Sequence, residues 1–283
     1  MELKRERADW QEYELLDSGH QEKCERFGEV IVVRPEPQAL WSPAGTEVWQ
    51  QATVRFEQRG DDGNWRVIKE PPESWLVSWN QLRFGLRLSS FKHTGVFPEQ
   101  AVNWAYLQSI LKPGDQLLNL FGYTGGATLA ALSAGAEVVH VDASRPAIAA
   151  AKHNAELSEL ADRPVRWIED DVVKFVQREI RRERRYEVIV LDPPAFGRGP
   201  RGEVWRFEIG LQPLLFACRE LLKPGGQLLL NAYSLGFPAL VVEQVAREVF
   251  SEATSIESVE LCLPEQAERG FLLPAGVTVR VKL

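Results

Sequence analysis

The chain has few cysteines, and none of them are clustered. Cys24, Cys218 and Cys262 stand far apart in 283 residues, and no Cys-x-x-Cys pair occurs. Zinc sites and disulfide frameworks need paired or closely spaced cysteines, so the sequence indicates neither. This sparse use of cysteine is typical of the reducing cytoplasm, where we expect the protein to act.

Long apolar runs and an excess of positive charge are also missing. No run approaches the roughly 20 apolar residues that a membrane-spanning helix needs, and the opening MELKRERADW is too charged for a signal peptide. Lys and Arg number 33 against 40 Asp and Glu, which gives a net charge of −7. We therefore expect no membrane contact and no global positive field that draws the chain to nucleic acid.

The first part of the chain has the pattern of a small β domain. Residues 1–88 are rich in tryptophan, and short β-type runs occur at 29–35, 49–58, 65–71 and 75–88. Turn signals such as GDDGN and EPPES separate these runs. We predict a mostly antiparallel β domain over residues 1–88.

Residues 89–283 instead alternate between strands and helices. A helix at 98–111 precedes strands at 116–121, 137–142, 165–171, 186–194 and 227–234, with helices between them. This alternation predicts a parallel sheet with helices on both faces. The last two strands, at 255–263 and 276–283, have no helix between them. We therefore expect them to form a hairpin, with the final strand antiparallel.

The turn after the first of these strands, NLFGYTGG, lacks the glycines of a dinucleotide-binding fingerprint. Phe121 and Tyr123 stand where that fingerprint needs glycine, and no Gly-Lys-Ser/Thr follows as in a P-loop. A tight turn with bulky walls suits a ligand without phosphates. Asp142 closes the next strand, where a carboxylate can accept hydrogen bonds from both ribose hydroxyls. S-adenosylmethionine fits these constraints, and the alternative is a simple strand–helix connection.

Polar residues also follow the next three strands. Asp171 ends the third strand, Asp192 ends the fourth, and Asn231 and Ser234 end the fifth. Ligands of open parallel sheets bind beyond the carboxyl ends of the strands, so we expect these side chains to face one site. There the Asp171 carboxylate would meet the adenine amino group.

S-adenosylmethionine is a methyl donor, so its binding would require a methyl acceptor. The segment LDPPAF suits a planar nitrogen heterocycle in that role. Its prolines stiffen the loop after the strand. Asp192 or the Pro193 carbonyl can bond a base edge, and Phe196 can stack on the ring, a contact worth about 1–3 kcal/mol. The alternative for Phe196 is packing at the sheet edge.

Two arginine-rich segments are candidate phosphate contacts. REIRRERR at 178–185 interleaves acids with its arginines, which favours the solvated face of a helix over a phosphate site. The segment 198–207 carries Arg198, Arg201 and Arg206 directly after the LDPPAF loop. Its Gly and Pro residues suit a lid or substrate clamp.

The cysteine positions favour a nitrogen acceptor over a carbon acceptor. Methylation of cytosine C5 needs a cysteine that attacks the base, and it must stand at the edge that carries Asp192. The fifth strand ends in NAYS, and Cys218 lies inside a predicted helix, where we expect a buried small apolar residue. A base nitrogen can accept a methyl group directly.

NLFGYTGG, HVDAS, DDV and LDPPAFGRG, in that order, resemble class I S-adenosylmethionine-dependent methyltransferases. More narrowly, they are similar to bacterial large-subunit ribosomal RNA methyltransferases that modify cytosine C5 or guanine N7. FKHTGVFPEQ resembles that family's KTGFFLDQR segment, and the likeness covers roughly residues 90–283. Two features differ from the family. No PUA domain is evident, and Glu99, Gln100 and Ala101 replace its Asp-Gln-Arg.

The resemblance implies a Rossmann-like methyltransferase fold over residues 89–283, S-adenosyl-L-methionine as donor and ribosomal RNA as substrate. The expected acceptor-side residues are Asp192, Pro193, Phe196 and Asn231. The expected donor-binding residues are Phe97, Gln100, Asn119, Phe121, Gly122, Tyr123, Thr124, Gly125, Asp142, Ala143, Asp171 and Asp192.

Two other functions stay open at this point. The acidic charge favours a small-molecule or protein methyltransferase, whose substrate need not carry phosphates. A non-catalytic RNA-binding assembly factor could also keep the fold, although a complete donor site speaks against it. The sequence predicts no metal site and leaves the oligomeric state undetermined.

Overall fold

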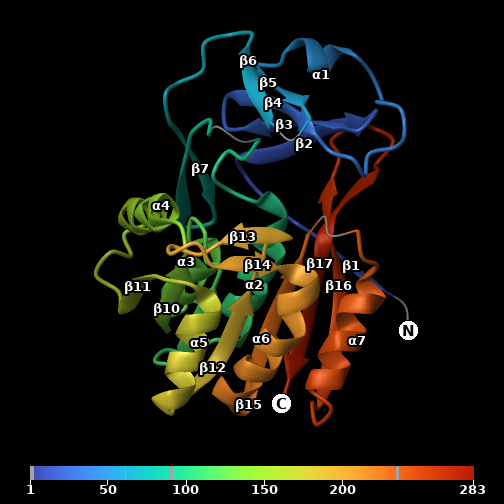
Figure 1. Ribbon diagram of the computed structural model, residues 1–283. Helices are drawn as coiled ribbons and strands as arrows, with labels where there is room; N and C mark the ends of the chain where they lie inside the picture. The colour runs from blue at the N-terminus through green and yellow to red at the C-terminus, as the bar shows by residue number, and fades with distance from the viewer. Residues whose placement is uncertain (1–2, 61, 90–91, 234–235) are drawn as a thin grey trace. The chain divides into compact units, whose positions relative to one another are not determined.

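The computed structural model describes residues 3–60, 62–89, 92–233 and 236–283 (Figure 1). The chain divides into two compact units. The α/β unit comprises Met1–Glu6, Val102–Leu261 and Ala275–Leu283, and the β unit comprises Arg7–Ala101 and Cys262–Pro274. The division into independent domains at residue 88 stays a prediction.

The α/β unit is built on a mostly parallel sheet. Central strand β9 pairs in parallel with β10 and β12, β10 pairs with β11, and β12 pairs with β15. β17 pairs antiparallel with β15, which confirms the predicted direction of the final strand. Among the described residues the strand order is β1 (Lys4–Arg7), β16 (Ser255–Pro264), β17 (Leu272–Lys282), β15 (Leu222–Ala232), β12 (Tyr186–Leu191), β9 (Gln116–Leu120), β10 (Glu137–Asp142) and β11 (Val165–Glu169).

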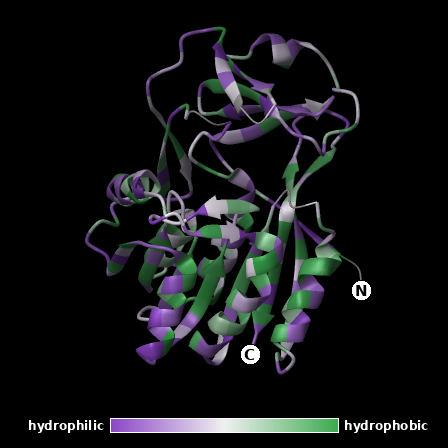
Figure 2. Cartoon of the chain, viewed as in Figure 1, coloured by the Kyte–Doolittle hydropathy of each residue, from purple (hydrophilic) through white to green (hydrophobic). Residues whose placement is uncertain are grey.

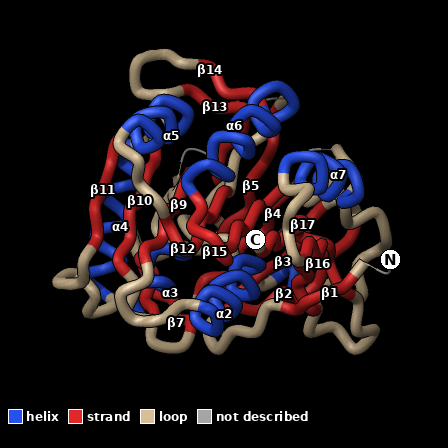
Figure 3. The backbone as a smooth tube through the Cα atoms, turned by 90° about the horizontal axis from the view of Figure 1, so that it is seen from below, coloured by secondary structure: helices blue, strands red, loops and turns tan. Residues whose placement is uncertain are grey.

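Helices cover both faces of this sheet, as the alternating pattern predicts. Figure 3 shows α5, α6 and α7 on one face, with α2, α3 and α4 on the other. A 3₁₀ turn at Pro98–Gln100 precedes α2. The helices are α2 (Ala101–Ile110), α3 (Gly126–Ser133), α4 (Arg145–Leu157), α5 (Val172–Arg181), α6 (Phe207–Leu221) and α7 (Ala239–Val249).

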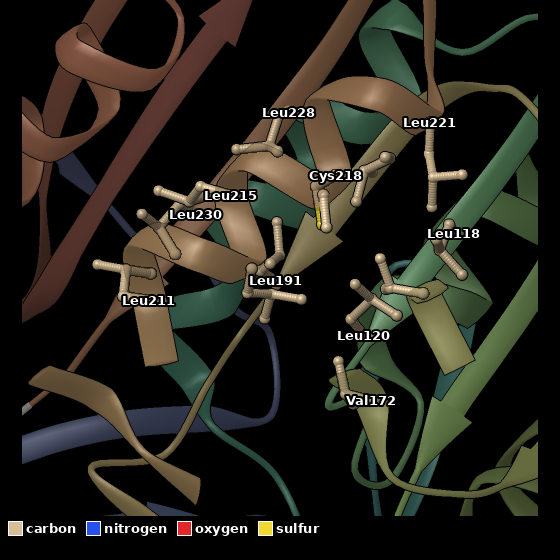
Figure 4. Packing of buried hydrophobic residues seen from close by; sticks show 14 of the residues in the cluster. Leu118, Leu120, Val172, Leu191, Leu211, Leu215, Cys218, Leu221, Leu228 and Leu230 are labelled. Carbon is tan, nitrogen blue, oxygen red and sulfur yellow. The ribbon is translucent and has the colours of Figure 1, made fainter. Parts of the chain in front are cut away.

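Leucine side chains fill the space between the sheet and α6 (Figure 4). On β9 and β15 the buried leucines that belong to this cluster lie an even number of positions apart, while on α6 the buried residues recur every three or four. The two periods bring both sets into one core, where each apolar side chain contributes about 1.5–3 kcal/mol. In Figure 2 the strands of the sheet are mostly hydrophobic (green), whereas the helices also carry hydrophilic residues (purple). The cluster includes Leu118, Leu120, Leu211, Leu215, Cys218, Leu221, Leu228 and Leu230.

A short hairpin interrupts the segment that we expected to be a loop between β12 and the next helix. Its strands are β13 (Phe196–Arg198) and β14 (Val204–Arg206), paired antiparallel. Helix α6 begins directly after β14 at Phe207, four residues before the predicted start at 211.

The β unit contains a sheet in the order β2-β3-β4-β5-β6 and a separate β7–β8 hairpin. Its pairings are antiparallel except β4–β5, which confirms the mostly antiparallel prediction. Strands β2 and β3 were not predicted from the sequence. The bounds are β2 (Tyr13–Gly19), β3 (Glu22–Phe27), β4 (Val30–Pro35), α1 (Glu47–Gln50), β5 (Val54–Arg59), β6 (Asp62–Val67), β7 (Trp75–Trp79) and β8 (Leu82–Leu86).

Candidate active site

The turn between β9 and α3 has a strained backbone. Phe121 and Tyr123 have φ angles of 58° and 46°, in the left-handed region that bulky residues rarely adopt. Gly122 lies between them, and a Cβ atom there would come within 2.6 Å of Nδ1 of His140. Gly125 has φ of 91° at the start of α3. Strain of this kind persists where the surroundings fix it, and it concentrates at functional sites.

Asp142, at the end of β10, locks this turn in place. Its Oδ2 accepts a hydrogen bond from the Tyr123 N–H at 2.8 Å, and its Oδ1 accepts one from the Ser144 N–H at 2.7 Å. Burial raises the pKa of Asp142, and these N–H groups oppose the rise. A carboxylate has about four acceptor positions. The Ala143 N–H also acts on this carboxylate, so its acceptor positions are partly filled, and its contact with the ribose hydroxyls stays a prediction.

A chain of hydrogen bonds between three buried polar side chains supports the turn. Asn119 Nδ2 donates to Thr128 Oγ1 at 2.9 Å, and Thr128 Oγ1 lies 2.9 Å from Nδ1 of His140. Burial lowers the pKa of His140 to about 3, so its ring is neutral and its Nδ1 can accept the Thr128 proton. The amide of Asn119 is thus engaged inside the protein, and its donor contact stays a prediction.

Other predicted donor-binding residues of the α/β unit lie at the same edge of the sheet. Asp171 caps α5 by accepting a hydrogen bond from the Lys174 N–H at 2.9 Å. The Thr124 carbonyl accepts one from Asn154 Nδ2 at 2.9 Å, and Ala143 is half-buried beside Asp142. Asp171 therefore has a structural role, and its contact with adenine stays a prediction.

Phe97 and Gln100 belong to the β unit. They flank the 3₁₀ turn before α2, where the Gln100 N–H donates to the Phe97 carbonyl at 3.1 Å. Their donor contacts stay predictions. The first residue of the FKHTGVFPEQ segment, Phe91, lies outside the described residues.

Asp192, directly after β12, has a carboxylate for which the described residues supply no partner. Its backbone N–H donates to the Leu120 carbonyl at 3.3 Å, which holds it beside the end of β9. Burial raises its pKa from 3.8 to about 6. The side chain is half-buried, and among the described residues it makes no hydrogen bond or ion pair. A ligand with a donor group would satisfy this carboxylate.

The β13–β14 hairpin stands directly after Asp192. Trp205 is buried, and its Nε1 donates a hydrogen bond to the Pro194 carbonyl at 2.7 Å. The ring centroids of Trp205 and Phe121 lie 5.1 Å apart. The hairpin thereby links the LDPPAF segment to the turn after β9. Phe196 is 54% exposed at the start of β13. It is thus free of the core, which suits the predicted stacking contact and disfavours the packing alternative.

Asn231 lies in a buried polar cluster. Its Oδ1 accepts hydrogen bonds from Asn103 Nδ2 at 2.9 Å and from Thr278 Oγ1 at 2.6 Å. The residue is 2% exposed, so this oxygen is occupied by the protein. Ser234, which the sequence places near it, lies outside the described residues.

Sequence reasoning missed His140, Thr128 and Trp205. His140 stands among valines in EVVHVD, and its one available signal is that a polar side chain interrupts an apolar strand. Trp205 lies in a segment too short and too rich in Gly and Arg to show a strand period.

None of the three cysteines stands at the end of β12, where Asp192 follows. Cys218 is fully buried inside α6, and burial raises the pKa of its thiol (Figure 4). Cys24 is buried on β3 and Cys262 is buried on β16, and burial raises the pKa of Cys24 to about 12. Within the described ranges no cluster of His, Cys, Asp or Glu could hold a metal ion. Helices long and apolar enough to cross a membrane are likewise absent from the described part of the chain.

The chain is similar to known methyltransferases over most of its length. A family model of S-adenosylmethionine-dependent methyltransferases matches residues 6–268. The crystal structure of an S-adenosylmethionine-dependent methyltransferase from Agrobacterium tumefaciens is 40% identical, with a TM-score of 0.94. That match covers 100% of this chain and 93% of the other.

Two curated relatives carry ribosomal RNA names. Ribosomal RNA large subunit methyltransferase I of Vibrio parahaemolyticus is 30% identical over 57% of this chain and 41% of its own length. Ribosomal RNA large subunit methyltransferase K/L of Pseudoalteromonas atlantica is 30% identical over 79% of this chain and 31% of its own length. The chain spans less than half the length of either relative.

The sheet order, the strained turn after β9 and the family match all indicate the same fold. The match also confirms the predicted fold class and methyl donor, because the family is defined by dependence on S-adenosylmethionine. The chain therefore belongs to the S-adenosylmethionine-dependent methyltransferase family.

Proposed function

We propose that this protein methylates a base nitrogen in structured RNA, with ribosomal RNA as the first candidate. The observation that carries the proposal is the half-buried carboxylate of Asp192, which has no partner in the described ranges and is followed within four residues by the exposed ring of Phe196. A carboxylate and an exposed aromatic ring this close in sequence suit a flat base with hydrogen-bonding edges. The printed names of the two curated relatives add support for RNA. On this proposal the protein acts in the cytoplasm.

The residues present fit the methyl donor. Asp142 retains acceptor capacity for ribose hydroxyls, and the strained turn around Gly122 gives a fixed wall beside it. Two further carboxylates lie at the same edge of the sheet. That of Asp171 would accept a hydrogen bond from the adenine amino group, and that of Asp192 would bind a cationic or N–H group. When bound, S-adenosylmethionine supplies a methyl group already activated by its sulfonium.

The chain's own task is to position the acceptor. Phe196 would stack on the ring of the base, while Asp192 or the carbonyl of Pro193 would hold its edge. Pro193 is buried, so this loop offers little freedom once the base is in place. The proposal does not use Asn231 directly, because Asn103 and Thr278 occupy its oxygen.

The buried cysteines favour nitrogen as the acceptor atom. Attack by a thiolate on C5 of cytosine needs a reactive, accessible cysteine. Burial of Cys218 raises its pKa and so suppresses the thiolate. A nitrogen lone pair needs no such step.

A second candidate function is methylation of a protein or small molecule. The net charge of −7 favours it, because such an acceptor need not carry phosphates. The non-catalytic RNA-binding alternative receives no support, since Asp142 and Asp192 both keep capacity for a ligand.

Transfer of label tests the proposal. Purified protein is incubated with methyl-labelled S-adenosylmethionine and, separately, with deproteinised ribosomal RNA, a cell protein extract and a metabolite extract. We expect label in RNA, recovered after nuclease digestion as a nucleoside methylated on a base nitrogen. Label confined to protein or metabolites would support the second candidate instead.

The Phe196→Ala variant separates acceptor from donor in the same assay. Loss of stacking should lower transfer about tenfold or more, while the affinity for S-adenosylhomocysteine stays close to the wild-type value. Phe216→Ala, which removes an exposed ring from α6, is the matched control. Parallel loss of donor affinity would assign Phe196 to packing.

A further inference from the structure

The β13–β14 hairpin has one face buried and one face exposed. Phe196 pairs with Arg206 and Arg198 pairs with Val204, while Gly197 and Trp205 pair between them. Side chains on paired strands alternate between faces. Trp205 is buried, so Phe196, Arg198, Val204 and Arg206 share the outer face, and all four are exposed. We call this surface, with exposed Arg201 at the hairpin tip, the hairpin face.

We propose that the hairpin face binds the sugar–phosphate backbone of the RNA strand that carries the acceptor base. This inference rests on the proposed function and adds the surface that would give RNA affinity to an acidic protein. The position follows from the chain, because the hairpin begins four residues after Asp192.

Within the part of the chain that the structure describes, the arginines of the hairpin face have no acidic partner. Arg198, Arg201 and Arg206 form no ion pair among the described residues, although the chain carries 40 acidic side chains. Glu203, the acid between them, already pairs with Lys174 of α5, and that contact is the main reason its pKa falls to about 2. The hairpin therefore presents three uncompensated positive charges.

Two arginines in the run 178–185 behave differently. Arg178 pairs with Asp170, and Arg182 pairs with Glu179. Their charges are partly neutralised within the protein, which supports the solvated-face interpretation of that run. Arg181, Arg184 and Arg185 of the same run form no ion pair among the described residues, so what distinguishes the hairpin arginines is their place directly after Asp192.

The hairpin face also combines one aromatic ring with its basic side chains. The Arg198 guanidinium lies 5.9 Å from the ring centroid of Phe196, within cation–π range. Surfaces that bind single-stranded RNA combine rings for bases with cations for phosphates. A protein partner fits less well, because the cores of such interfaces are depleted of charge and would desolvate three guanidinium groups.

Hydrogen bonds fix the conformation of the hairpin before RNA binds. Besides the Trp205 indole bond, the Phe207 N–H donates to the Ala195 carbonyl at 3.0 Å and closes its base. At the tip, Glu203 accepts the Arg201 N–H at 2.9 Å. A surface fixed before binding loses less entropy when RNA docks.

Salt dependence of RNA binding tests the inference. The probe is a fluorescent single-stranded RNA of mixed sequence, about 12 nucleotides long, and affinity is measured by anisotropy at several salt concentrations. The wild-type protein is compared with the triple variant Arg198→Ala, Arg201→Ala, Arg206→Ala. Removal of three phosphate contacts should reduce the slope of log K against log salt by about 2.

Two matched variants control for charge alone. Arg181→Ala, Arg184→Ala, Arg185→Ala removes three exposed arginines from the run after Asp170 and should leave the slope near the wild-type value. Lysine at all three hairpin positions should retain most of the slope, because the charge remains. Affinity for S-adenosylhomocysteine should stay unchanged in every variant, which shows that the α/β unit is folded.

The outcomes separate the inference from the function beneath it. A wild-type slope in the hairpin alanine variant, with methyl transfer to RNA retained, would overturn the hairpin face alone. Equal loss in both alanine variants would overturn it too, since the effect would then be one of net charge. A wild-type protein that binds neither this probe nor deproteinised ribosomal RNA would overturn both proposals.

Discussion

Asp192 illustrates how a single residue can be kept at a cost in stability. Its carboxylate has no partner among the described residues, and burial raises its pKa from 3.8 to about 6. The folded protein therefore binds a proton more tightly than the unfolded chain does. Below about pH 4 both states are protonated, and folded stability falls as the pH rises through 4 to 6.

Asp192→Asn should therefore stabilise the ligand-free protein at pH 8. We expect a gain of about 1–3 kcal/mol in the free energy of unfolding, since each pKa unit corresponds to about 1.4 kcal/mol. Most of this gain should be absent at pH 4. Urea unfolding at the two pH values measures it, with the exposed Asp162→Asn as control. An equal gain at both values would show that the carboxylate is not desolvated.

Asp142 differs because its oxygens already accept two backbone N–H groups. Asp142→Ala removes a charged acceptor worth about 1.5–3 kcal/mol and also frees the turn. We expect S-adenosylhomocysteine to bind at least about tenfold more weakly in calorimetry, while Asp162→Ala binds normally. Unchanged affinity in a folded variant would remove Asp142 from the donor site.

The difference between these aspartates and His140 shows what sequence can disclose about a site. Asp142 and Asp192 end apolar strands, so their shared edge follows from the chain pattern alone. His140 is defined by what it touches: Thr128 at 2.9 Å and the space where a Gly122 side chain would be. Contacts of that kind depend on packing that a strand pattern does not record.

Among elements, the turn after β9 depends on the missing side chain of Gly122, because a Cβ atom there would overlap the His140 ring. Gly122→Ala should cost about 1–3 kcal/mol through overpacking and should weaken S-adenosylhomocysteine binding. The φ angle of Gly122 is not left-handed, so packing alone accounts for this cost. Adding His140→Ala should relieve part of it. A double-mutant cycle by urea unfolding measures the coupling, and strictly additive losses would contradict the account.

Elements with a clear period were predicted, and elements stabilised by distant partners were not. The alternation from β9 to α7 follows from runs of apolar residues. Strand β2 instead buries Asp17 and Ser18, whose partners Arg269 and Glu265 lie about 250 residues away along the chain. Nothing near β2 in the sequence signals that these polar residues are satisfied. The three-residue strands β13 and β14 are too short to show a period.

At the scale of the whole molecule, the placement of all three cysteines bears on the chemistry. Each is buried, and none stands at the end of β12. The variant Cys24→Ser, Cys218→Ala, Cys262→Ala should keep methyl transfer within a small factor, apart from modest packing losses. Steady-state transfer to RNA measures this, with S-adenosylhomocysteine binding as the test of folding. A folded variant that binds this ligand but transfers nothing would return cytosine C5 as the target.

The distribution of charge is the other property of the whole chain. A net charge of −7 repels RNA at a distance, so affinity must come from a local surface such as the hairpin face. The measurement that tests the central claim most directly is mass-spectrometric nucleoside analysis of ribosomal RNA from a strain lacking the gene, beside its parent. The account predicts that one nucleoside methylated on a base nitrogen disappears in the deletion strain and returns with the wild-type gene, but not with Asp142→Ala. Identical nucleoside profiles in the two strains would contradict it.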